Sequence, residues 1–342
     1  MRFEQIRDYG LSIGYSHIGV APVDSLSGFA DEIMSRGDEY DFFLKMLTRS
    51  VQKRVPEAKS IIVLVWDYFQ HDYPEALQEI IGKLYLSRCF VAPPGYVSHA
   101  RLKLMTDFLA SSGMSLDADP YFLPSRWVGA KAGIVDIGKN TFAYTNDSGS
   151  YISLNTIVVD QAFEYGHQAT ATKCPPNCSV CIDACPTKAL YAPFRLDPQK
   201  CIAFNNFMTQ DKNGFAPSFI PDELRASIGC KIHGCDICQD VCPRNQKKLK
   251  QPKPRDNYIE EKAPTITLSN ILNMSDDFYD QTINAILYNY KVDKRFLMRN
   301  AALAMGNSKD ERYIDDLAAA MEHPDALVRE YAAWALEQIK GG

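Results

Sequence analysis

The 342-residue sequence has no apolar run long enough to cross a membrane. Its longest such run, over residues 60–66, has the length of a β-strand, whereas a membrane helix needs about 20 apolar residues. The amino-terminal residues mix charged and polar side chains and lack the apolar stretch of a secretory signal. The G-x-G-x-x-G and P-loop motifs are also absent, so nucleotide hydrolysis has no support. A net charge of −5 argues against sequence-independent coating of nucleic acid, although it permits a local basic site.

Cysteine is scarce outside one segment of the chain. Nine of the ten cysteines lie between Cys174 and Cys242, and the tenth, Cys89, is interpreted as a packed thiol. Without a secretory signal we expect a cytoplasmic protein, in which clustered thiols are more often metal ligands or redox groups than disulfides. The composition, 46% hydrophobic and 23% charged, excludes a disordered, collagen-like or coiled-coil chain.

Hydrophobic patterning divides the chain into three predicted domains. Residues 1–165 alternate between strand and helix signals, which predicts an α/β (α+β) domain. Residues 166–255 are turn-rich and carry the cysteines, as expected of a ferredoxin-like module in which a metal cluster replaces much of the core. Residues 256–342 are predicted to be helical. Within the first domain, helices are expected over residues 5–11, 31–47, 74–86 and 99–111, and strands over 16–21, 60–68 and 153–160.

A weak internal repeat lies near the carboxyl terminus. Residues 297–306 match residues 328–337 at an offset of 31, with alanines at equivalent places and a further helical pattern between them. Small residues within an apolar stripe favour a HEAT-like helical hairpin. One and a half repeats cannot bury their own apolar face, so we expect this region to pack on the rest of the chain.

The cysteines contain two copies of the pattern C-x2-C-x3-C-P. One copy ends at Pro186 and the other at Pro243. Closely spaced thiolates wrap one corner of a cubane, and in two-cluster ferredoxins the last cysteine of each copy ligates the other cluster. This pattern predicts two 4Fe–4S clusters, ligated by Cys174, Cys178, Cys181 and Cys242 in cluster one and by Cys185, Cys201, Cys235 and Cys238 in cluster two. A pair of zinc knuckles is the alternative, which the paired copies disfavour.

Cys174 is the least secure of these eight ligands. It is separated from Cys178 by three residues instead of two, and Cys230, five residues before Cys235, is a competing ligand. Two adjacent clusters carry single electrons, which implies a further redox centre in the amino-terminal domain.

At this point the chain resembles the epoxyqueuosine reductase family, whose members are cobalamin-dependent iron–sulfur enzymes distantly similar to reductive dehalogenases. The resemblance rests on residues 11–22 and 52–63, on the glycine–lysine–asparagine segment within 130–141, and on the stretch between the two cysteine motifs. It extends over nearly the whole chain. It implies a cobalamin-binding α/β domain, and HEAT-like helices are also expected of the family.

The resemblance also implies site residues. Asp119 falls where the family places its proton-donating aspartate, and Arg126 falls on the arginine of the same segment. Tyr121, Phe122 and Trp127 could supply an apolar pocket around the acid. Segments 90–99 and 119–126 depart from the family pattern, which places the substrate in doubt more than the cofactor. The alternative role for Asp119 is a helix or turn cap.

Four residues are predicted to contact the cobalamin on the same grounds. They are Arg54, Gly138, Lys139 and Asn140, with Tyr96 and His99 as weaker candidates. Taken alone, residues 138–140 also fit a tight turn with a solvated lysine, and Arg54 fits a surface cation. The Asp-x-His-x-x-Gly signature is absent, so any corrinoid would be bound without that histidine ligand.

The family acts on a modified base in a tRNA anticodon loop, which implies a tRNA partner. Candidate phosphate contacts are the basic run 244–255, with six basic residues and no acid, and Lys291, Lys294, Arg295 and Arg299. A solvated linker is the other interpretation of such a run. We further expect an external low-potential electron donor, no membrane partner and a monomer.

The preferred hypothesis is therefore reduction of epoxyqueuosine to queuosine in tRNA, with electrons passing through both clusters and Asp119 supplying a proton. One rival is a divergent corrinoid reductase of a small molecule such as an organohalide. The other is a non-enzymatic electron-transfer or reactivating partner of another corrinoid protein.

Overall fold

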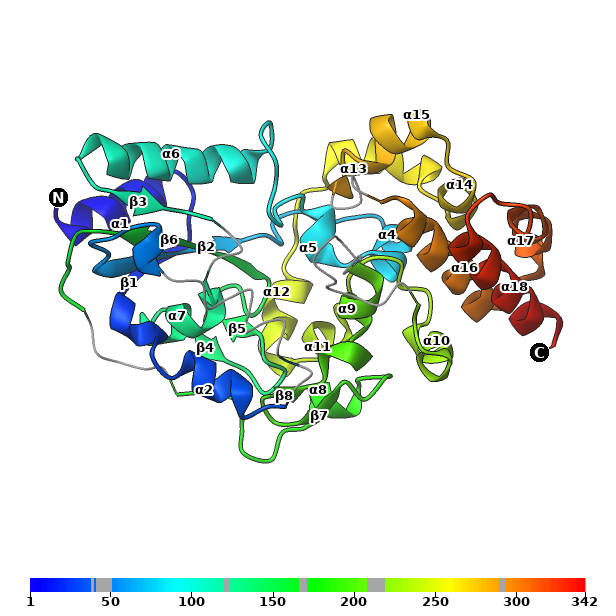
Figure 1. Ribbon diagram of the computed structural model, residues 1–342, viewed down its shortest axis with the longest axis horizontal. Helices are drawn as coiled ribbons and strands as arrows, with labels where there is room; N and C mark the ends of the chain where they lie inside the picture. Colours follow the sequence, from blue (N-terminus) through cyan, green and yellow to red (C-terminus); the bar gives the residue numbers. More distant parts are fainter. Residues whose placement is uncertain are drawn as a thin grey trace.

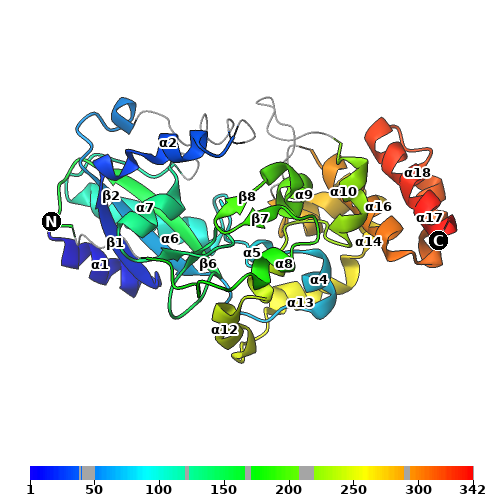
Figure 2. The same cartoon turned by 90° about the horizontal axis from the view of Figure 1, so that it is seen from below.

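The computed structural model describes residues 1–37, 40, 51–119, 123–165, 171–207, 219–288 and 293–341. Figure 1 shows an elongated molecule with an α/β layer at the amino-terminal end, helices at the carboxyl-terminal end and the cysteine segment between them. The two termini lie at opposite ends of the long axis (Figure 2). Within the described residues, no helix is both long and apolar enough to cross a membrane.

A four-stranded sheet forms the centre of the amino-terminal layer. Its strand order is β1-β2-β6-β3, and every neighbouring pair is antiparallel. Six consecutive residues of the central strand β2, from Ser60 to Val65, are buried, which confirms the prediction of a strand covered on both faces. The strands are β1 (His17–Pro22), β2 (Ser60–Asp67), β3 (Leu116–Asp117) and β6 (Ile152–Val159).

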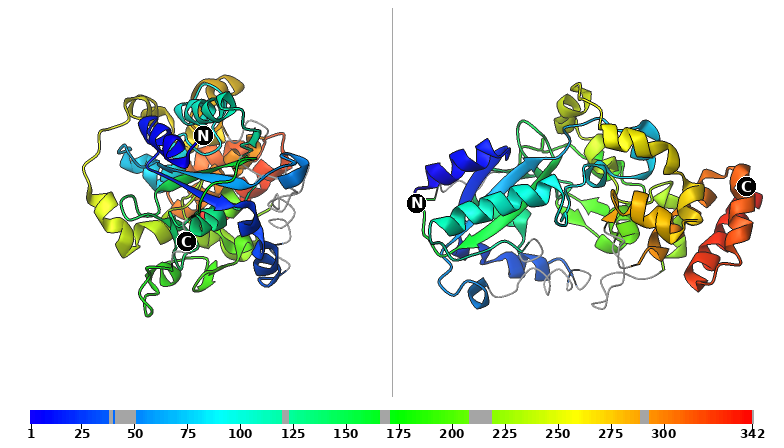
Figure 3. Two further views of the ribbon diagram at one scale, coloured as in Figure 1. Left: turned by 90° about the vertical axis from the view of Figure 1, so that its left-hand side faces the viewer. Right: turned by 90° about the horizontal axis from the view of Figure 1, so that it is seen from above.

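Helices cover the two faces of this sheet. Helices α1 (Phe3–Ser12) and α6 (Val97–Ser111) pack on one face, where they meet Ile62 and Leu64. Helix α7 (Ser125–Lys131) packs on the other face. The two views of Figure 3 show α1 and α6 together on one side of the strands. The alternation of β2 side chains thus separates two apolar layers, one under α6 and one under α7.

Two predicted helices differ from the structure. The pattern over residues 74–86 forms two short helices, α4 (Glu75–Ile80) and α5 (Lys83–Leu86), because Gly82 donates its N–H to the carbonyl of His233 at 2.8 Å. That hydrogen bond connects the break between α4 and α5 to the chain just before the second cysteine motif. The pattern over 31–47 begins as α2 (Phe29–Met34), and residues 41–50 lie outside the described part of the chain.

The cysteine segment is built from short elements. Each C-x2-C-x3-C motif wraps a single helical turn, α8 (Val180–Asp183) in the first copy and α11 (Ile237–Asp240) in the second, and the two turns contact each other. The small sheets beside them pair β4 (Asp136–Ile137) with β5 (Ala143–Tyr144) and β7 (Leu190–Ala192) with β8 (Arg195–Leu196). The remaining helices here are α9 (Ile202–Phe207), α10 (Asp222–Ile228) and α12 (Gln246–Lys250).

The carboxyl-terminal region is helical, as predicted. The repeated sequence segments form α16 (Arg295–Ser308) and α18 (Ala326–Lys340), which pack against each other with α17 (Ile314–Ala320) beside them. A Cβ atom on Gly306 would lie 2.7 Å from Cα of Ala335, so the two helices touch where the repeat carries small residues. The other helices of the region are α13 (Asn257–Lys262), α14 (Leu268–Leu272) and α15 (Asp276–Phe278).

The largest apolar cluster does not follow the predicted boundary at residue 165. It joins buried residues between Tyr68 and Cys89 to residues of the cysteine segment and to the carboxyl-terminal helices. The chain therefore leaves the sheet after β2, contributes α4 and α5 to the other half of the molecule, and returns with α6.

Candidate functional site

The first predicted ligand set is gathered around α8. Burial raises the pKa of the Cys181 thiol, and the neighbouring Cys242 thiol raises it further. Cys174 and Cys178 lie close enough to add to the same shift. Cys242, which is the last cysteine of the second motif, thus joins three cysteines of the first motif.

The second predicted set gathers around α11. Burial raises the pKa of the Cys238 thiol well above its usual range, and Cys235 and Cys201 add to the shift. Burial and the Cys185 thiol both raise the pKa of Cys201. Cys181 also contributes to the shift of Cys238, so the two sets are neighbours.

The donor set fits iron–sulfur clusters. All ten cysteines are free thiols. Among the described residues, no group of three or more His, Cys, Asp or Glu side chains is arranged to hold a metal ion. The thiols gather in two neighbouring sets, and each set includes the last cysteine of the other motif, which is the pattern of two cubanes and not of two separate zinc knuckles. Thiolate sulfur is also the ligand that such clusters require.

Cys230 lies apart from both sets. Its thiol is 3.8 Å from the carbonyl oxygen of Ala304, and its charged neighbours are Glu79 and Lys231. Cys174, in contrast, accepts a hydrogen bond from the backbone N–H of Lys139 at 3.4 Å. This arrangement favours Cys174 over Cys230 as the remaining ligand of cluster one, and the ligand assignment stays a prediction.

Lys139 is buried against the first cysteine loop. Its side chain is 7% exposed, although a lysine of this segment was predicted to contact cobalamin or solvent. The ammonium Nζ donates to three carbonyl oxygens, at 2.8 Å to Pro175, 2.6 Å to Pro176 and 2.9 Å to Cys178. An ammonium has three donors. The structure therefore gives all of them to the loop that carries Cys174 and Cys178.

The next residue, Asn140, binds the other motif. Its Nδ2 donates to the carbonyl oxygen of Cys238 at 3.1 Å and to the hydroxyl of Tyr144 at 2.8 Å. Gly138 precedes it where no side chain fits, because a Cβ atom would lie 2.5 Å from Cε2 of Tyr144. Residues 138–141, called the clamp turn below, thus hold both cysteine motifs.

Arg126 contacts the same turn from α7. Its Nη1 donates to the carbonyl oxygen of Thr141 at 2.7 Å, its guanidinium carbon lies 5.9 Å from the ring centroid of Phe142, and the residue as a whole is exposed. Its positive charge opposes the effect of burial on the thiol of Cys201, which places the guanidinium near the second set. The clamp turn therefore connects both cysteine motifs to a residue that was predicted for the substrate pocket.

Asp119 and Arg126 are not paired with each other. Asp119 accepts a hydrogen bond at 2.9 Å from Arg54, which also forms an ion pair with Asp117. Two residues from the predicted catalytic and cobalamin sets are thus joined in one salt bridge. Tyr121 and Phe122 lie outside the described residues, and the indole N–H of Trp127 donates to the carbonyl of Ser25.

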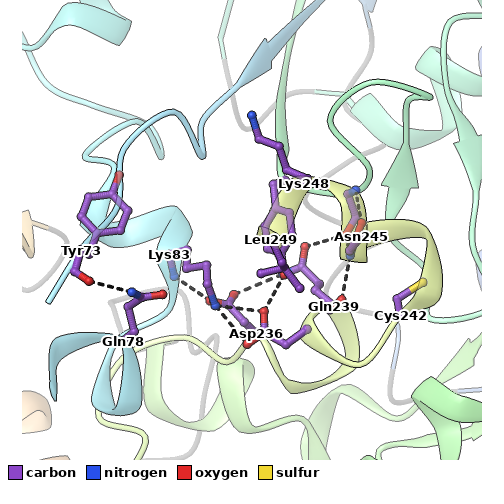
Figure 4. Close-up of polar contacts among 12 residues, drawn as sticks. Tyr73, Gln78, Lys83, Asp236, Gln239, Cys242, Asn245, Lys248 and Leu249 are labelled. Atoms are coloured by element: carbon purple, nitrogen blue, oxygen red, sulfur yellow. Dashed lines mark hydrogen bonds and ion pairs between the residues drawn. The ribbon is translucent and has the colours of Figure 1, made fainter. Parts of the chain in front are cut away.

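Polar side chains pack against the second cysteine motif and support it (Figure 4). Lys83 of α5 lies 2.9 Å from Asp240, and its backbone N–H donates to Asp236 at 2.7 Å. Burial raises the pKa of Asp236, and the Lys83 ammonium opposes that shift. On the far side of α11, Asn245 donates to the carbonyl of Gln239 at 2.7 Å. These contacts fix the orientation of the turn that carries Cys235 and Cys238.

Most of the predicted phosphate contacts are buried or form ion pairs within the chain, so their role toward tRNA stays a prediction. Arg299 is fully buried and donates to the carbonyl of Asn205. Arg244 binds the buried carboxylate of Asp136 through two bonds of 2.7 Å. The other paired side chains are Lys248 with Asp67, Lys294 with Asp276, Arg295 with Asp293 and Asp325, and Arg255 with Glu260. Lys247 and Lys250 remain exposed, and Lys291 lies outside the described residues.

Arg244 and Lys83 are supporting residues that the sequence did not single out for the clusters. Although burial opposes it, hydrogen bonds to Asp136 and to the Cys174 thiol raise the pKa of Arg244. Arg244 directly follows Pro243 of the second motif, so its position in the sequence could have indicated a role beside the clusters. Lys83 lies more than 150 residues before α11, and no local pattern connects them.

Fold and site together define a double-cluster iron–sulfur protein with a HEAT-like region. Residues 173–245 match the family model of a 4Fe-4S double cluster binding domain, and residues 299–323 match a PBS lyase HEAT-like repeat. An epoxyqueuosine reductase of Xanthomonas campestris pv. campestris is 30% identical over 84% of this chain and 80% of that relative. The Bacillus subtilis enzyme is 29% identical over 98% of this chain and 87% of that relative. The chain belongs to the epoxyqueuosine reductase family.

Solved structures agree with this assignment. A crystal structure of an epoxyqueuosine reductase with an epoxyqueuosine-modified tRNA-Tyr stem loop has a TM-score of 0.80 and 27% identity, over 98% of this chain and 90% of that one. A Bacillus subtilis structure, whose catalytic aspartate loop is swung out of the active site, has a TM-score of 0.79 and 28% identity with the same coverage.

Proposed function

We propose that this protein reduces epoxyqueuosine to queuosine in tRNA. The observation that carries the proposal is the clamp turn, which joins two adjacent cysteine sets to Arg126. An epoxide reductase needs single electrons and a substrate pocket beside the groups that deliver them. The clamp turn connects the cysteine sets directly to Arg126, which is the residue proposed for that pocket. The family membership favours this function over a small-molecule reductase or a non-enzymatic electron carrier.

Cobalamin is the proposed second redox group. Arg126 and Thr141 suit it, because an exposed guanidinium and a half-buried hydroxyl residue lie together near the second cysteine set. Lys139 and Asn140 suit it less well, since their polar groups bind the cysteine loops. We therefore assign Arg126 and Thr141 to the corrinoid face, and Lys139 and Asn140 to the clusters. When bound, cobalamin supplies a strongly reducing centre for the carbon–oxygen bond of the epoxide.

The chain's own residues have separate tasks in this reaction. Asp119 donates the proton that the epoxide oxygen needs as its bond to carbon breaks. In the structure this carboxylate is held by Arg54, so donation requires both its release from that salt bridge and its uptake of a proton from solvent. Arg126 orients a polar group of the substrate. The eight cysteines of the two sets carry the clusters that relay electrons from an external low-potential donor to this face.

We infer that the protein works in a reducing compartment, the cytoplasm, because its ten thiols are free. We also propose a monomer. The anticodon loop of the tRNA is the proposed partner, and its target base would enter beside Arg126.

Anaerobic reconstitution tests the function. The protein is loaded with iron, sulfide and cobalamin, chemically reduced, and incubated with tRNA that contains epoxyqueuosine. We expect mass analysis of the digested nucleosides to show the loss of one oxygen atom from the modified base. Protein without cobalamin is the control. If the loaded, reduced protein leaves the nucleoside mass unchanged, the proposed function is wrong.

The role of Asp119 is tested by Asp119→Asn. Asparagine keeps the size of the side chain but cannot donate a proton as an acid, so we expect turnover to fall by about 10²-fold or more. Cobalamin retention and tRNA affinity should stay close to the wild-type values. Asp117→Asn, which alters the neighbouring partner of Arg54, is the matched control. Full turnover by Asp119→Asn would remove the proposed proton donor.

A further inference from the structure

A pocket lies on the face of the sheet that α6 covers. It has a volume of about 360 Å³ and is formed by the end of β2, the chain after α5, the first turn of α6 and α13. In Figure 1 the first turn of α6 is the end that faces α5 and α13. Because α7 covers the opposite face of the sheet, this pocket is separate from the surface around Arg126.

Arg101 is a buried cation in this pocket. It is 8% exposed, its Nε donates to the carbonyl of Ile13 at 3.0 Å, and its guanidinium carbon lies 3.4 Å from the ring centroid of Trp66. Among the described residues, no carboxylate lies within ion-pair distance of Arg101. Arginine stays charged in proteins, and an unpaired buried charge is costly. A carbonyl oxygen and the ring faces of Trp66 and Tyr15 meet this charge, and no anion among the described residues pairs with it.

The start of α6 adds a second positive feature. This helix has 15 residues, its N-cap residue Tyr96 provides no side-chain hydrogen bond, and its first turn contains no acid. Tyr96, Val97 and Ser98 all line the pocket. The first amides of a helix lack partners within the helix and carry the positive end of its dipole. An anion in the pocket would reach both these amides and Arg101.

The remaining lining residues contribute no negative charge. Among the described residues, no aspartate or glutamate lines the pocket. Burial raises the pKa of the Cys89 thiol to about 12, so this thiol is neutral at physiological pH. Arg88, the other cation in the lining, forms an ion pair with Asp256. The lining thus carries the guanidinium groups of Arg88 and Arg101, and Asp256, which lies outside the lining, neutralises that of Arg88.

We propose that this pocket binds a phosphate group, which matches the oxyanion chemistry of a guanidinium beside a helix N-terminus. Its volume falls at the lower end of the roughly 300–1,000 Å³ of ligand pockets, enough for a phosphate with its ester arms. The phosphate comes either from a free phosphorylated small molecule or from the backbone of the tRNA. The second source rests on the proposed function, and the first does not.

Two variants of the cofactor-loaded full chain remove the site in different ways. Arg101→Met deletes the cation. Val97→Glu places an acid at the first residue of α6, where it favours the helix but repels a bound anion; Val97 is 73% exposed, so the new side chain has room. Leu104→Glu is the matched control, because it adds the same charge to the same helix at a side chain that is 49% exposed and outside the pocket lining.

Calorimetric titration with inorganic phosphate at low ionic strength tests the free source. We expect wild type and Leu104→Glu to bind alike, and both site variants to bind about tenfold more weakly or not at all. Titration with an anticodon stem-loop RNA tests the backbone source. There, Arg101→Met should reduce the slope of log affinity against log salt by about one relative to wild type.

Weaker phosphate binding by the site variants supports the site and identifies a free phosphate as its ligand. A smaller salt slope for RNA supports the site and identifies the tRNA backbone as its ligand. If wild type does not bind phosphate and neither site variant changes RNA affinity or its salt slope, the site is overturned. Because neither titration requires turnover, a failure of epoxyqueuosine reduction would leave a positive phosphate result standing, and the two proposals fail separately.

Discussion

Lys139 shows how one side chain serves a cluster without ligating it. Its buried ammonium bonds three carbonyls of the first cysteine loop, and its backbone N–H donates to the sulfur of Cys174. Reduction adds negative charge to a cluster, and a nearby cation in a low-dielectric setting stabilises that charge. Lys139 is therefore expected to raise the reduction potential of cluster one.

We expect Lys139→Met to shift the midpoint potential of cluster one to a more negative value, because the reduced cluster loses its cation. The shift is measured by an EPR-monitored redox titration of the reconstituted protein. Lys188→Met is the matched control, since Lys188 is exposed near the same motif and water screens its charge. Equal potentials in wild type and Lys139→Met would contradict this role.

The sequence predicted ligands better than it predicted their supports. The cysteine spacing is a local signal that predicts two ligand sets, and the ligand assignment itself stays a prediction. The partners of Lys139, Arg244 and Arg299 are set by tertiary contacts that no local pattern encodes. A basic run without acids looked like a phosphate surface, yet the acids that neutralise it, such as Asp67 and Asp136, come from distant strands.

Among the elements, α16 and α18 confirm the prediction from the repeat. Both contain the alanines that matched at the 31-residue offset, and Gly306 lies where the helices touch. Helix 74–86 was predicted as one element because periodicity does not register a tertiary bond. The hydrogen bond from Gly82 to His233 divides it, and the break brings Lys83 to α11.

We expect Gly306→Val to destabilise the protein by about 1–3 kcal/mol, because the new side chain would overlap Ala335. The free energy of unfolding is measured by anaerobic denaturant titration. Ala319→Val, at an exposed position of α17, is the control and should cost about 0.5 kcal/mol or less from helix propensity. Similar losses in both variants would show that close packing of α16 on α18 contributes nothing.

At the scale of the whole molecule, the predicted domains are less separate than the sequence suggested. The helical region does pack on the rest of the chain, as predicted. Asn300 of α16 donates to the carbonyls of Asn206 and Ile232, at 2.8 Å each. Those residues belong to the stretch between Cys201 and Cys235. The HEAT-like region is therefore part of the support of the second cysteine set.

We expect Asn300→Leu to lower the free energy of unfolding by about 2–4 kcal/mol, because two buried carbonyls lose their donor. The iron content of the reconstituted protein should fall, with the EPR signal of cluster two weakened more than that of cluster one. Asn273→Leu, at an exposed amide that bonds Ser269 and Asp316, is the control. Full iron content in Asn300→Leu would mean that the second set assembles without this contact.

The contact between Asn300 and the segment before Cys235 also has a consequence for biosynthesis. Asn300 is synthesised 58 residues after Cys242, the last of the cysteines. A nascent chain that has just completed its last cysteine thus lacks the donor that braces the second set. The complete support of the second set is therefore formed only once the sequence through α16 has been made.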